Sequence, residues 1–482
     1  MEFIVEEYST FYKIKKQPTL NLYDLKKALS TRDFMNNVIS YAYTEYPTMI
    51  TIPKIDRETL KKNINGDLIF QKMSDMPCKP IKFKMINKPK DGVQEEVIEK
   101  VLENFKTDNQ TIVTLQTGQG KTYIATNIIS QLKTKALILV QRDTLRKQWY
   151  ESFKSHTNCK NVVTLKGTTD LQILLEEDEY YDVYITTHAS IRNFINEFGI
   201  KNFNLLLLKH GIGIKVYDEF DMETKSMFYL DTHTNIQKTL YLSATDFKSS
   251  KSDQAVFKRV FGDMKNIGKE YYKIVDRDAI IYLYNSQPTD KERKKCYRYM
   301  YHLRESKFDK QRFHLYQMGK KSLIDIMDLI WKGHIRHKLG KGYRFIFFIG
   351  RIDPAEGFKT FISDRYRYDI NNIGIFNSSV SKKDKEKEIQ KEIIISTSLS
   401  LGRGVDMDKL DTVVDLETRS SKSEFAQVVG RISRTGGVKG TYIMVVDKAF
   451  EEVFNNFRNK KYKDYFSNIK INDLTEEGDE FE

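Results

Sequence analysis

A lysine and a threonine end a short glycine-bearing turn in the stretch LQTGQGKTYIATNII, residues 115–129. The preceding segment TIVTL is β-branched and apolar and predicts a buried strand, and the following segment has apolar residues at helical spacing. Strand, glycine turn and helix in this order are the setting in which a Lys-Thr pair binds phosphate groups. Glycine lets the backbone turn so that its amides face the phosphates. The stretch therefore predicts a site for a nucleoside triphosphate.

Each residue of this turn has an expected role at the phosphates. Lys121 is expected to reach the β- and γ-phosphates, and Thr122 to hold Mg²⁺ beside them. The helix N-terminus adds its positive dipole end. Leu115 replaces the first glycine of the general pattern, so a glycine-rich strand–helix turn without a ligand is the alternative. Four further residues are expected to surround ATP: Thr117, Gly118, Gln119 and Gly120.

A second candidate site lies at the end of another apolar run, in VYDEFD, residues 216–221. Acidic residues at the carboxyl end of a buried strand are where a phosphate-binding-loop protein places its metal carboxylate and its water-orienting base. Asp218 is expected to serve Mg²⁺ through water, and Glu219 to polarise the attacking water. The alternative is an ordinary acidic turn. The phosphate-binding loop earlier in the chain makes this alternative less favoured.

Three more motifs follow in a fixed order: YLSAT (241–245), IIISTSLSLGRGVD (393–406) and QVVGRISR (427–434). Together with TGQGKT and DEFD, this series resembles that of superfamily 2 helicases and translocases over roughly residues 86–460. The resemblance implies an α/β fold with two tandem RecA-like domains, each a parallel sheet flanked by helices, and ATP in the cleft between them. Upstream strand-like pieces and one helical piece predict a small α+β N-terminal accessory domain.

The resemblance also assigns roles to individual residues of the second half. Arg431 and Arg434, three apart on a helix, match the arginine fingers that stabilise charge on the transferring phosphoryl group. Gln427 lies one turn earlier and is expected to line the same cleft. Asp406 resembles the residue that contacts the ribose side of the nucleotide, with a turn-capping role as the alternative.

Further resemblances concern coupling and base recognition in the first half. Ser243 and Thr245 resemble the motif that links hydrolysis to movement, through hydrogen bonds to the acidic motif. Gln94 resembles the adenine-reading glutamine, although Val93 replaces the usual aromatic residue before it; an exposed helix glutamine is the alternative. Phe220 stands where alanine is usual, which puts the coupling contact of Asp221 in doubt.

Several strand-end residues match positions that grip a nucleic-acid backbone in the family. Such contacts position the strand without reading its sequence. Water-facing strand-end polar groups are the alternative for all of them, and Trp149 is expected to be a core residue because it lies four residues after Leu145. The candidates are Arg142, Thr144 and Thr187 in the first domain and Arg351 and Thr397 in the second.

Residues 291–321 interleave lysine and arginine with tyrosine, phenylalanine and histidine. Such a mixture suits a nucleic-acid surface. Cys296, Met300 and Leu303 fall at helical spacing, however, so the favoured interpretation is a helix with one packed aromatic face and some basic residues near the nucleic acid.

The charge of the chain favours one class of partner. The net charge of +13 and a pI of about 9.1 suit a polyanion, nucleic acid first, although a generally lysine-rich proteome would give the same balance.

Three scattered cysteines indicate neither a zinc site nor a disulfide framework. Signal-peptide and membrane-spanning patterns are not recognised, so a cytoplasmic protein is expected, in the host cytoplasm if viral.

We expect four parts along the chain. Residues 1–85 form an N-terminal accessory domain, and residues 86–265 form the first RecA-like domain. Residues 266–460 form the second RecA-like domain, which includes a basic linker helix at 291–335, and residues 461–482 form an acidic tail. This compact plan resembles phage UvsW-type DNA helicases and implies an ATP-dependent motor, monomeric, acting on forked or branched DNA in replication and recombination. DNA is favoured over RNA. The alternatives are a poxvirus-type transcript-release helicase, an ATP-gated clamp without unwinding and an unrelated P-loop phosphotransferase.

Overall fold

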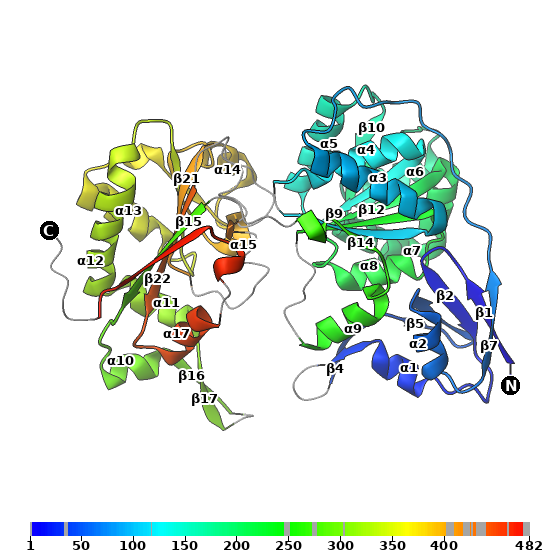
Figure 1. Ribbon diagram of the computed structural model, residues 1–482, viewed down its shortest axis with the longest axis horizontal. Coiled ribbons are helices and arrows are strands. Elements are labelled where there is room, and N and C mark those ends of the chain that lie inside the picture. Colours follow the sequence, from blue (N-terminus) through cyan, green and yellow to red (C-terminus); the bar gives the residue numbers. More distant parts are fainter. Residues whose placement is uncertain are drawn as a thin grey trace. The chain divides into compact units, whose positions relative to one another are not determined.

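The fold is taken from a computed structural model, and Figure 1 shows its elements. The structure describes residues 2–32, 37–116, 118–244, 251–271, 277–301, 304–401, 409–417, 425, 428–429, 440–459 and 462–475. The chain divides into two units, Met1–Tyr272 and Lys273–Glu482, and each is described by itself.

The first unit begins with a five-stranded mixed sheet in the order β5-β6-β2-β1-β7. Strand β1 alternates exposed and buried residues over its first four positions, because one face packs on the core and the other faces solvent, whereas β6 is buried along most of its length. The predicted strands and helix of this N-terminal part are confirmed. Its elements are β1 (Glu2–Glu7), β2 (Phe11–Lys15), α1 (Tyr23–Ala28), β3 (Ser30–Arg32), β4 (Val38–Tyr41), β5 (Thr44–Glu45), β6 (Met49–Pro53), α2 (Arg57–Lys62) and β7 (Asp67–Lys72).

A seven-stranded parallel sheet forms the centre of the first unit, in the order β10-β11-β9-β12-β13-β8-β14. Its central strands are buried throughout, as expected for a parallel sheet covered on both faces. The strands are β8 (Gln110–Thr114), β9 (Lys135–Val140), β10 (Val162–Thr164), β11 (Val183–Thr187), β12 (Ile212–Asp218), β13 (Lys238–Ser243) and β14 (Asn266–Ile267).

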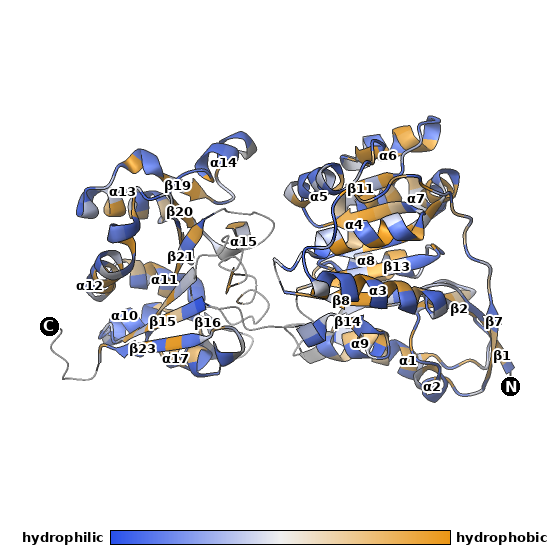
Figure 2. Ribbon diagram, turned by 45° about the horizontal axis from the view of Figure 1, so that its top comes forward, coloured by the Kyte–Doolittle hydropathy of each residue, from blue (hydrophilic) through white to orange (hydrophobic). Residues whose placement is uncertain are grey.

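Helices connect these strands and cover the sheet. In Figure 2 they carry both blue and orange residues, as amphipathic helices on a sheet do. They are α3 (Gly92–Thr107), α4 (Lys121–Leu132), α5 (Asp143–His156), α6 (Gly167–Glu176), α7 (His188–His210), α8 (Thr224–Asp231) and α9 (Lys251–Phe261), with a 3-10 turn at Lys269–Tyr271.

The second unit has its own seven-stranded parallel sheet, in the order β19-β20-β18-β21-β22-β15-β23. Two parallel sheets with flanking helices confirm the predicted tandem RecA-like fold. The strands are β15 (Arg277–Tyr284), β18 (Arg344–Phe348), β19 (Ile373–Phe376), β20 (Ile393–Ser396), β21 (Leu410–Asp415), β22 (Gly440–Asp447) and β23 (Asn468–Asp473).

The remaining elements of the second unit include a separate two-stranded hairpin. They are α10 (Asp290–Lys295), β16 (Tyr297–Met300), β17 (Glu305–Phe308), α11 (Lys310–Met318), α12 (Lys321–Ile330), a π-helical turn (Trp331–Ile335), α13 (Ala355–Tyr366), α14 (Lys382–Glu388), α15 (Ser398–Leu401) and α17 (Glu451–Arg458), with 3-10 turns at Arg336–Lys338, Ile370–Asn372 and Tyr462–Asp464.

The predicted linker helix at 291–335 is wrong, because the β16–β17 hairpin interrupts it. The first strand of the second sheet is β15. Part of the predicted acidic tail forms the edge strand β23, which pairs with β15. Residues 266–267 pair with β8 in the first sheet, so the first unit extends past the predicted boundary at 265.

The N-terminal part and the first RecA-like sheet share one hydrophobic core, which contains Phe3 and Ile52 together with Tyr217 and Phe261. Cys78, Cys159 and Cys296 are free thiols. Within the described ranges, no helix combines the length and the apolar character that crossing a bilayer requires.

Candidate functional site

The glycine turn joins β8 to α4, where the sequence places the phosphate loop. Gly118 and Gly120 have φ angles of 91° and 81°, in the region that favours glycine. A Cβ at Gly120 would lie 2.2 Å from Nε2 of Gln94, so only glycine fits this turn. Lys121 directs its ammonium at the loop and donates to the carbonyl oxygen of Leu115 at 2.8 Å. Thr122 follows in the first turn of α4.

Gln94 is buried against the phosphate loop and is not the exposed helix glutamine of the alternative interpretation. Its backbone amide donates to the N-cap carboxylate of Asp91 at 2.9 Å, which begins α3. Its side-chain Nε2 donates to the carbonyl of Gln119 at 3.1 Å, and its Oε1 accepts from the amide of Lys90 at 2.9 Å. Both ends of the amide are therefore fixed beside the loop.

The acidic pair ends β12, which is separated from β8 by β13 alone. Asp218 is buried, and its Oδ2 accepts a hydrogen bond of 2.8 Å from the indole Nε1 of Trp149. Burial raises the pKa of Asp218, while the Trp149 hydrogen bond and the nearby charge of Lys121 oppose that rise. Phosphate loop and acidic pair thus lie at the same edge of one sheet, about two strand spacings or roughly 10 Å apart.

The backbone turns sharply at the second acid. Glu219 has φ of 51°, a left-handed conformation that is uncommon for a residue other than glycine and often marks functional sites. Its carbonyl accepts from Nε2 of Gln141 at 3.3 Å, which connects the turn after β12 to the end of β9.

The acidic motif and the Ser-Ala-Thr motif are in direct contact. Ser243, the last residue of β13, donates from Oγ to Oδ1 of Asp221 at 2.9 Å. Phe220, which replaces the usual alanine, is buried among Tyr241, Phe257 and Phe261 with ring centroids 5.3–5.4 Å away. The larger side chain is accommodated because aromatic residues of α9 and β13 surround it, and the Asp221 contact is kept.

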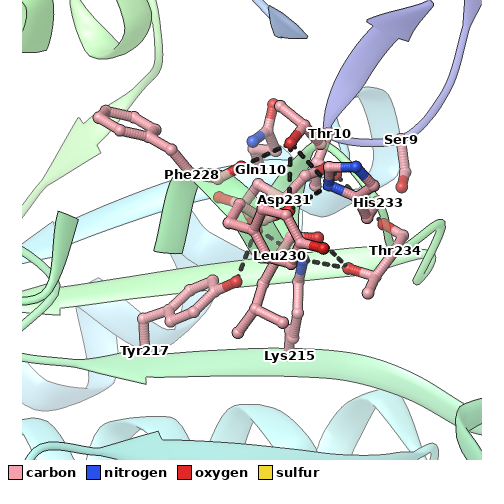
Figure 3. Close-up of polar contacts among 12 residues, drawn as sticks. Ser9, Thr10, Gln110, Lys215, Tyr217, Phe228, Leu230, Asp231, His233 and Thr234 are labelled. Atoms are coloured by element: carbon pink, nitrogen blue, oxygen red, sulfur yellow. Dashed lines mark hydrogen bonds and ion pairs between the residues drawn. The ribbon is translucent and has the colours of Figure 1, made fainter. Parts of the chain in front are cut away.

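A buried polar network beneath these loops was not recognised in the sequence (Figure 3). Asp231, at the end of α8, accepts from Lys215 Nζ at 2.6 Å and from Tyr217 Oη at 2.8 Å through Oδ1. Its Oδ2 accepts from Tyr241 Oη at 2.8 Å, and Tyr241 in turn accepts from Gln110 at 2.7 Å. One carboxylate therefore connects β8, β12 and β13, the three strands that end in the candidate ATP-site motifs.

The same helix end holds the N-terminal part. Thr10 donates from its hydroxyl to the carbonyl of Asp231 at 2.7 Å, and Ser9 donates from its amide to Oδ1 of Asn235 at 3.1 Å. Asn235 also donates to the carbonyl of Ser74 at 2.7 Å. The turn between β1 and β2 is thus attached to the segment that follows α8, which lies behind the acidic motif.

The predicted nucleic-acid residues of the first unit follow neighbouring strands. Arg142 precedes α5 and is half-buried, and Thr144 lies exposed in the first turn of α5. Thr187 ends β11, where it pairs in register with Val140. The Thr187 hydroxyl is buried and caps α7 by accepting from the amide of Ser190 at 3.1 Å. The hydroxyl of Thr187 thus has a capping role within the chain, and its contact with nucleic acid stays a prediction.

In the second unit, Arg351 and Thr397 follow the adjacent strands β18 and β20. Arg351 is paired with the carboxylate of Asp353, with its Nε 3.1 Å from Oδ2. Thr397 is buried and its hydroxyl lies 3.0 Å from Oγ of Ser400, so it acts within the chain. The Arg351 side chain is partly exposed, and nucleic-acid contact by Arg351 and Thr397 stays a prediction.

Six predicted site residues fall outside the described ranges: Thr117, Thr245, Asp406, Gln427, Arg431 and Arg434. No group of three or more metal-ligating side chains occurs among the residues that the structure describes. Mg²⁺ bound beside a triphosphate needs few protein ligands, since waters and phosphate oxygens supply the others. The glycine cradle, Lys121 and the buried Asp218 at one sheet edge fit such a bound nucleotide.

Comparison with known sequence families agrees with this geometry. Residues 89–248 match the family described as "Type III restriction enzyme, res subunit", and residues 322–436 match "Helicase conserved C-terminal domain". The two matches together cover more than half of the chain and contain the phosphate loop, the acidic pair and the QVVGRISR motif. The chain belongs to the superfamily 2 helicases and is a nucleic-acid-dependent ATPase of that class.

Viral proteins are among the relatives of this chain. A protein of Acanthamoeba polyphaga mimivirus, named as an ATP-dependent RNA helicase, is 22% identical over 79% of this chain and 68% of its own length. A transcript termination protein of Yaba-like disease virus is 26% identical over 73% of this chain and 71% of its own. The solved structure of S. cerevisiae Dbp5 bound to RNA and ADP BeF3 matches in fold, with a TM-score of 0.52 and 14% identity, over 81% of this chain and 91% of that chain.

Proposed function

We propose that this chain is an ATP-driven DNA translocase or helicase whose hydrolytic site is built from the phosphate loop and the DEFD motif. The observation that carries this proposal is the meeting of Lys121, Asp218 and the Ser243–Asp221 contact at the carboxyl ends of neighbouring strands. In this arrangement a bound triphosphate, its metal and the coupling motif lie within reach of one another.

Each residue has a defined task in ATP hydrolysis. Lys121 neutralises charge on the β- and γ-phosphates, and Thr122 and Asp218 hold the metal, Asp218 through water. Mg²⁺ supplies charge neutralisation of the phosphoryl oxygens. Glu219 orients and polarises the attacking water from its left-handed turn. In this proposal Gln94, beside Gly120, recognises the adenine with its amide, which exchanges its contacts with Gln119 and Lys90 for the base.

In this proposal the second unit contributes positively charged side chains to the ATP site. Arg431 and Arg434 stabilise the transferring phosphoryl group, with Gln427 beside them and Asp406 at the ribose. Stabilisation of developing charge by fixed arginines contributes orders of magnitude to such reactions. Closure of the two units around ATP and reopening after hydrolysis would then produce stepping along nucleic acid, with Ser243 and Thr245 transmitting the change.

The favoured client is forked or branched DNA in replication and recombination, as in the UvsW-type helicases that the compact plan resembles. The net charge of +13 supports a polyanionic partner of either kind. Transcript release is the second candidate, and a specific observation favours it: a relative that matches 73% of this chain is named as a transcript termination protein. The name of the mimivirus relative adds RNA as a possible client.

ATP hydrolysis with different nucleic acids distinguishes these clients. Turnover would be measured without nucleic acid and with single-stranded DNA, duplex DNA, forked DNA and single-stranded RNA of matched sequence. The proposal predicts the strongest stimulation by forked or branched DNA. Stimulation by RNA alone would contradict the DNA assignment and favour the second candidate, and turnover indifferent to all of them would contradict a motor of either kind.

A further inference from the structure

The hairpin formed by β16 and β17 stands apart from the sheet of the second unit, as Figure 1 shows. Its two strands pair only with each other among the described elements, in the register Tyr297 with Phe308 and Tyr299 with Ser306. An isolated two-stranded hairpin is marginally stable in water, so contacts at its base must hold it in place.

The base of the hairpin is anchored to the segment after β22. Tyr297 donates from Oη to the carboxylate of Glu452 at 2.9 Å. The ring of Phe308 packs against Phe313 and Phe450, with centroids 5.5 Å and 6.1 Å away. Phe450 is buried and lies three residues beyond the end of β22, so the hairpin is fixed at the carboxyl edge of the sheet.

The outer part of the hairpin exposes two tyrosines that touch each other. Tyr299 is 50% and Tyr301 is 85% exposed, and their ring centroids are 5.1 Å apart in an edge-to-face arrangement. Single exposed aromatic residues are ordinary, but an adjacent exposed pair at the end of a projecting hairpin is a surface available for stacking.

The hairpin and the segments beside it in the sequence carry an excess of basic side chains. Residues 290–312 contain nine basic and four acidic side chains. Arg298 and Lys307 face each other across the hairpin and keep 62% and 53% of their side chains exposed while pairing with Asp309 and Glu305. Such surface ion pairs contribute little to stability and exchange readily for another anion. The excess of positive charge therefore favours a polyanion as the occupant of this surface.

The hairpin lies at the same edge of the sheet as Arg351, the other candidate nucleic-acid contact of this unit. All strands of the sheet are parallel, so Arg351 after β18 and the anchoring segment after β22 lie at the same edge. Only β21 separates β18 from β22, which corresponds to about 10 Å along the edge. A strand of nucleic acid that follows this edge would pass from Arg351 to the hairpin.

We propose that the β16–β17 hairpin binds single-stranded nucleic acid, with Tyr299 and Tyr301 stacking on unpaired bases and with Arg298 and Lys307, on the opposite face of the hairpin, supplying positive charge for the phosphates. Bases of a duplex are hidden in the stack, whereas exposed aromatic rings bind bases that are unpaired. The inference rests on the proposed function, because it adds a contact surface for the nucleic acid on which the motor acts.

The test compares binding of labelled single-stranded DNA, single-stranded RNA and duplex DNA by the full chain, measured by fluorescence anisotropy. The double variant Tyr299→Ala/Tyr301→Ala should weaken single-strand binding roughly 30-fold or more, since stacking contributes on the order of 1–3 kcal/mol for each of two bases. Tyr299→Phe/Tyr301→Phe keeps the rings and should bind within about twofold of the wild type. Tyr23→Ala removes a tyrosine of the first unit that is 64% exposed and serves as the matched control.

A second variant tests the phosphate contacts. Arg298→Gln/Lys307→Gln should reduce the slope of log affinity against log salt by about one to two units, because fewer counterions are released on binding. Unchanged affinity of the alanine double variant, in a chain whose wild type binds single strands, would overturn the inference and leave the proposed function standing. An equal loss in the phenylalanine variant would overturn stacking. A wild type that binds none of the three nucleic acids would overturn the inference and the proposed function together.

Discussion

The indole Nε1 of Trp149 donates a 2.8 Å hydrogen bond to Oδ2 of Asp218, and both side chains are buried. Trp149 lies on α5, which begins directly after Arg142, whereas Asp218 ends β12. The tryptophan expected to be a plain core residue therefore also positions the candidate metal carboxylate. It connects the helix of a predicted nucleic-acid motif to the candidate catalytic acid.

Replacing Trp149 by phenylalanine should shift the pH dependence of ATP hydrolysis. Burial already raises the pKa of Asp218, and the Trp149 hydrogen bond opposes that rise, so its loss should raise the pKa further. The ionised carboxylate is the active form, and the acid limb of the kcat/KM profile should therefore move to higher pH, with weaker Mg²⁺ activation. Trp331→Phe, in the core of the second unit, is the control. An unshifted acid limb in Trp149→Phe would contradict a positioning role.

Removing the buried carboxylate of Asp231 should strongly destabilise the first unit. Asp231→Ala would leave Lys215 and the hydroxyls of Tyr217 and Tyr241 without their acceptor inside the core. Breaking one side of a buried ion pair costs roughly 3–5 kcal/mol, which chemical denaturation would measure as a lower free energy of unfolding. Glu58→Ala, which removes an exposed ion pair with Lys61, should cost less than about 1 kcal/mol. Similar losses in both variants would refute the importance of this network.

His188 should make the stability of the first unit depend on pH. The ring is buried, lies 5.7 Å from the ring of Tyr217 and has Nδ1 3.3 Å from Ser226 Oγ. Burial and the charge of Arg192 lower the pKa of His188 to about 4. The unfolded chain binds the proton near pH 6.5 and the folded chain only near pH 4, so stability is lost as pH falls through this window.

The loss attributable to His188 should reach roughly 3 kcal/mol across that window. His188→Gln cannot titrate, so its free energy of unfolding should fall less than that of the wild type between about pH 6.5 and pH 4. Urea titrations at both pH values would measure this difference, and His337→Gln, at an exposed histidine, should behave as the wild type. Parallel pH dependences of His188→Gln and wild type would show that His188 is not protonated on unfolding.

The loops and strands of the ATP site could be predicted because their signals are local. The apolar runs at 111–115 and 136–140, and the glycine turn between β8 and α4, each specify one conformation within a few residues. The Asp231 network could not be found in this way. Lys215 and Tyr217 alternate along β12 toward Asp231, but their common partner is revealed only by the packing of α8 on the sheet.

The hairpin and the edge strand show why two other predictions failed. Cys296 and Met300 fit a helical repeat, yet Tyr297, Tyr299 and Tyr301 fit the alternation of a strand equally well, and short segments carry too few residues to separate the two periods. Strand β23 has no buried residue because it forms the edge of its sheet, so its sequence resembles that of an exposed tail.

The most direct test of the account is ATP hydrolysis by wild type, Lys121→Ala and Glu219→Gln in the presence of forked DNA, with nucleotide binding measured on the same preparations. Wild type should hydrolyse ATP, Lys121→Ala should not, and Glu219→Gln should retain ATP binding while its hydrolysis falls by roughly 100-fold or more, because the water-orienting carboxylate is lost. Normal turnover by the Glu219→Gln chain would contradict the assignment of the acidic pair on which the account depends.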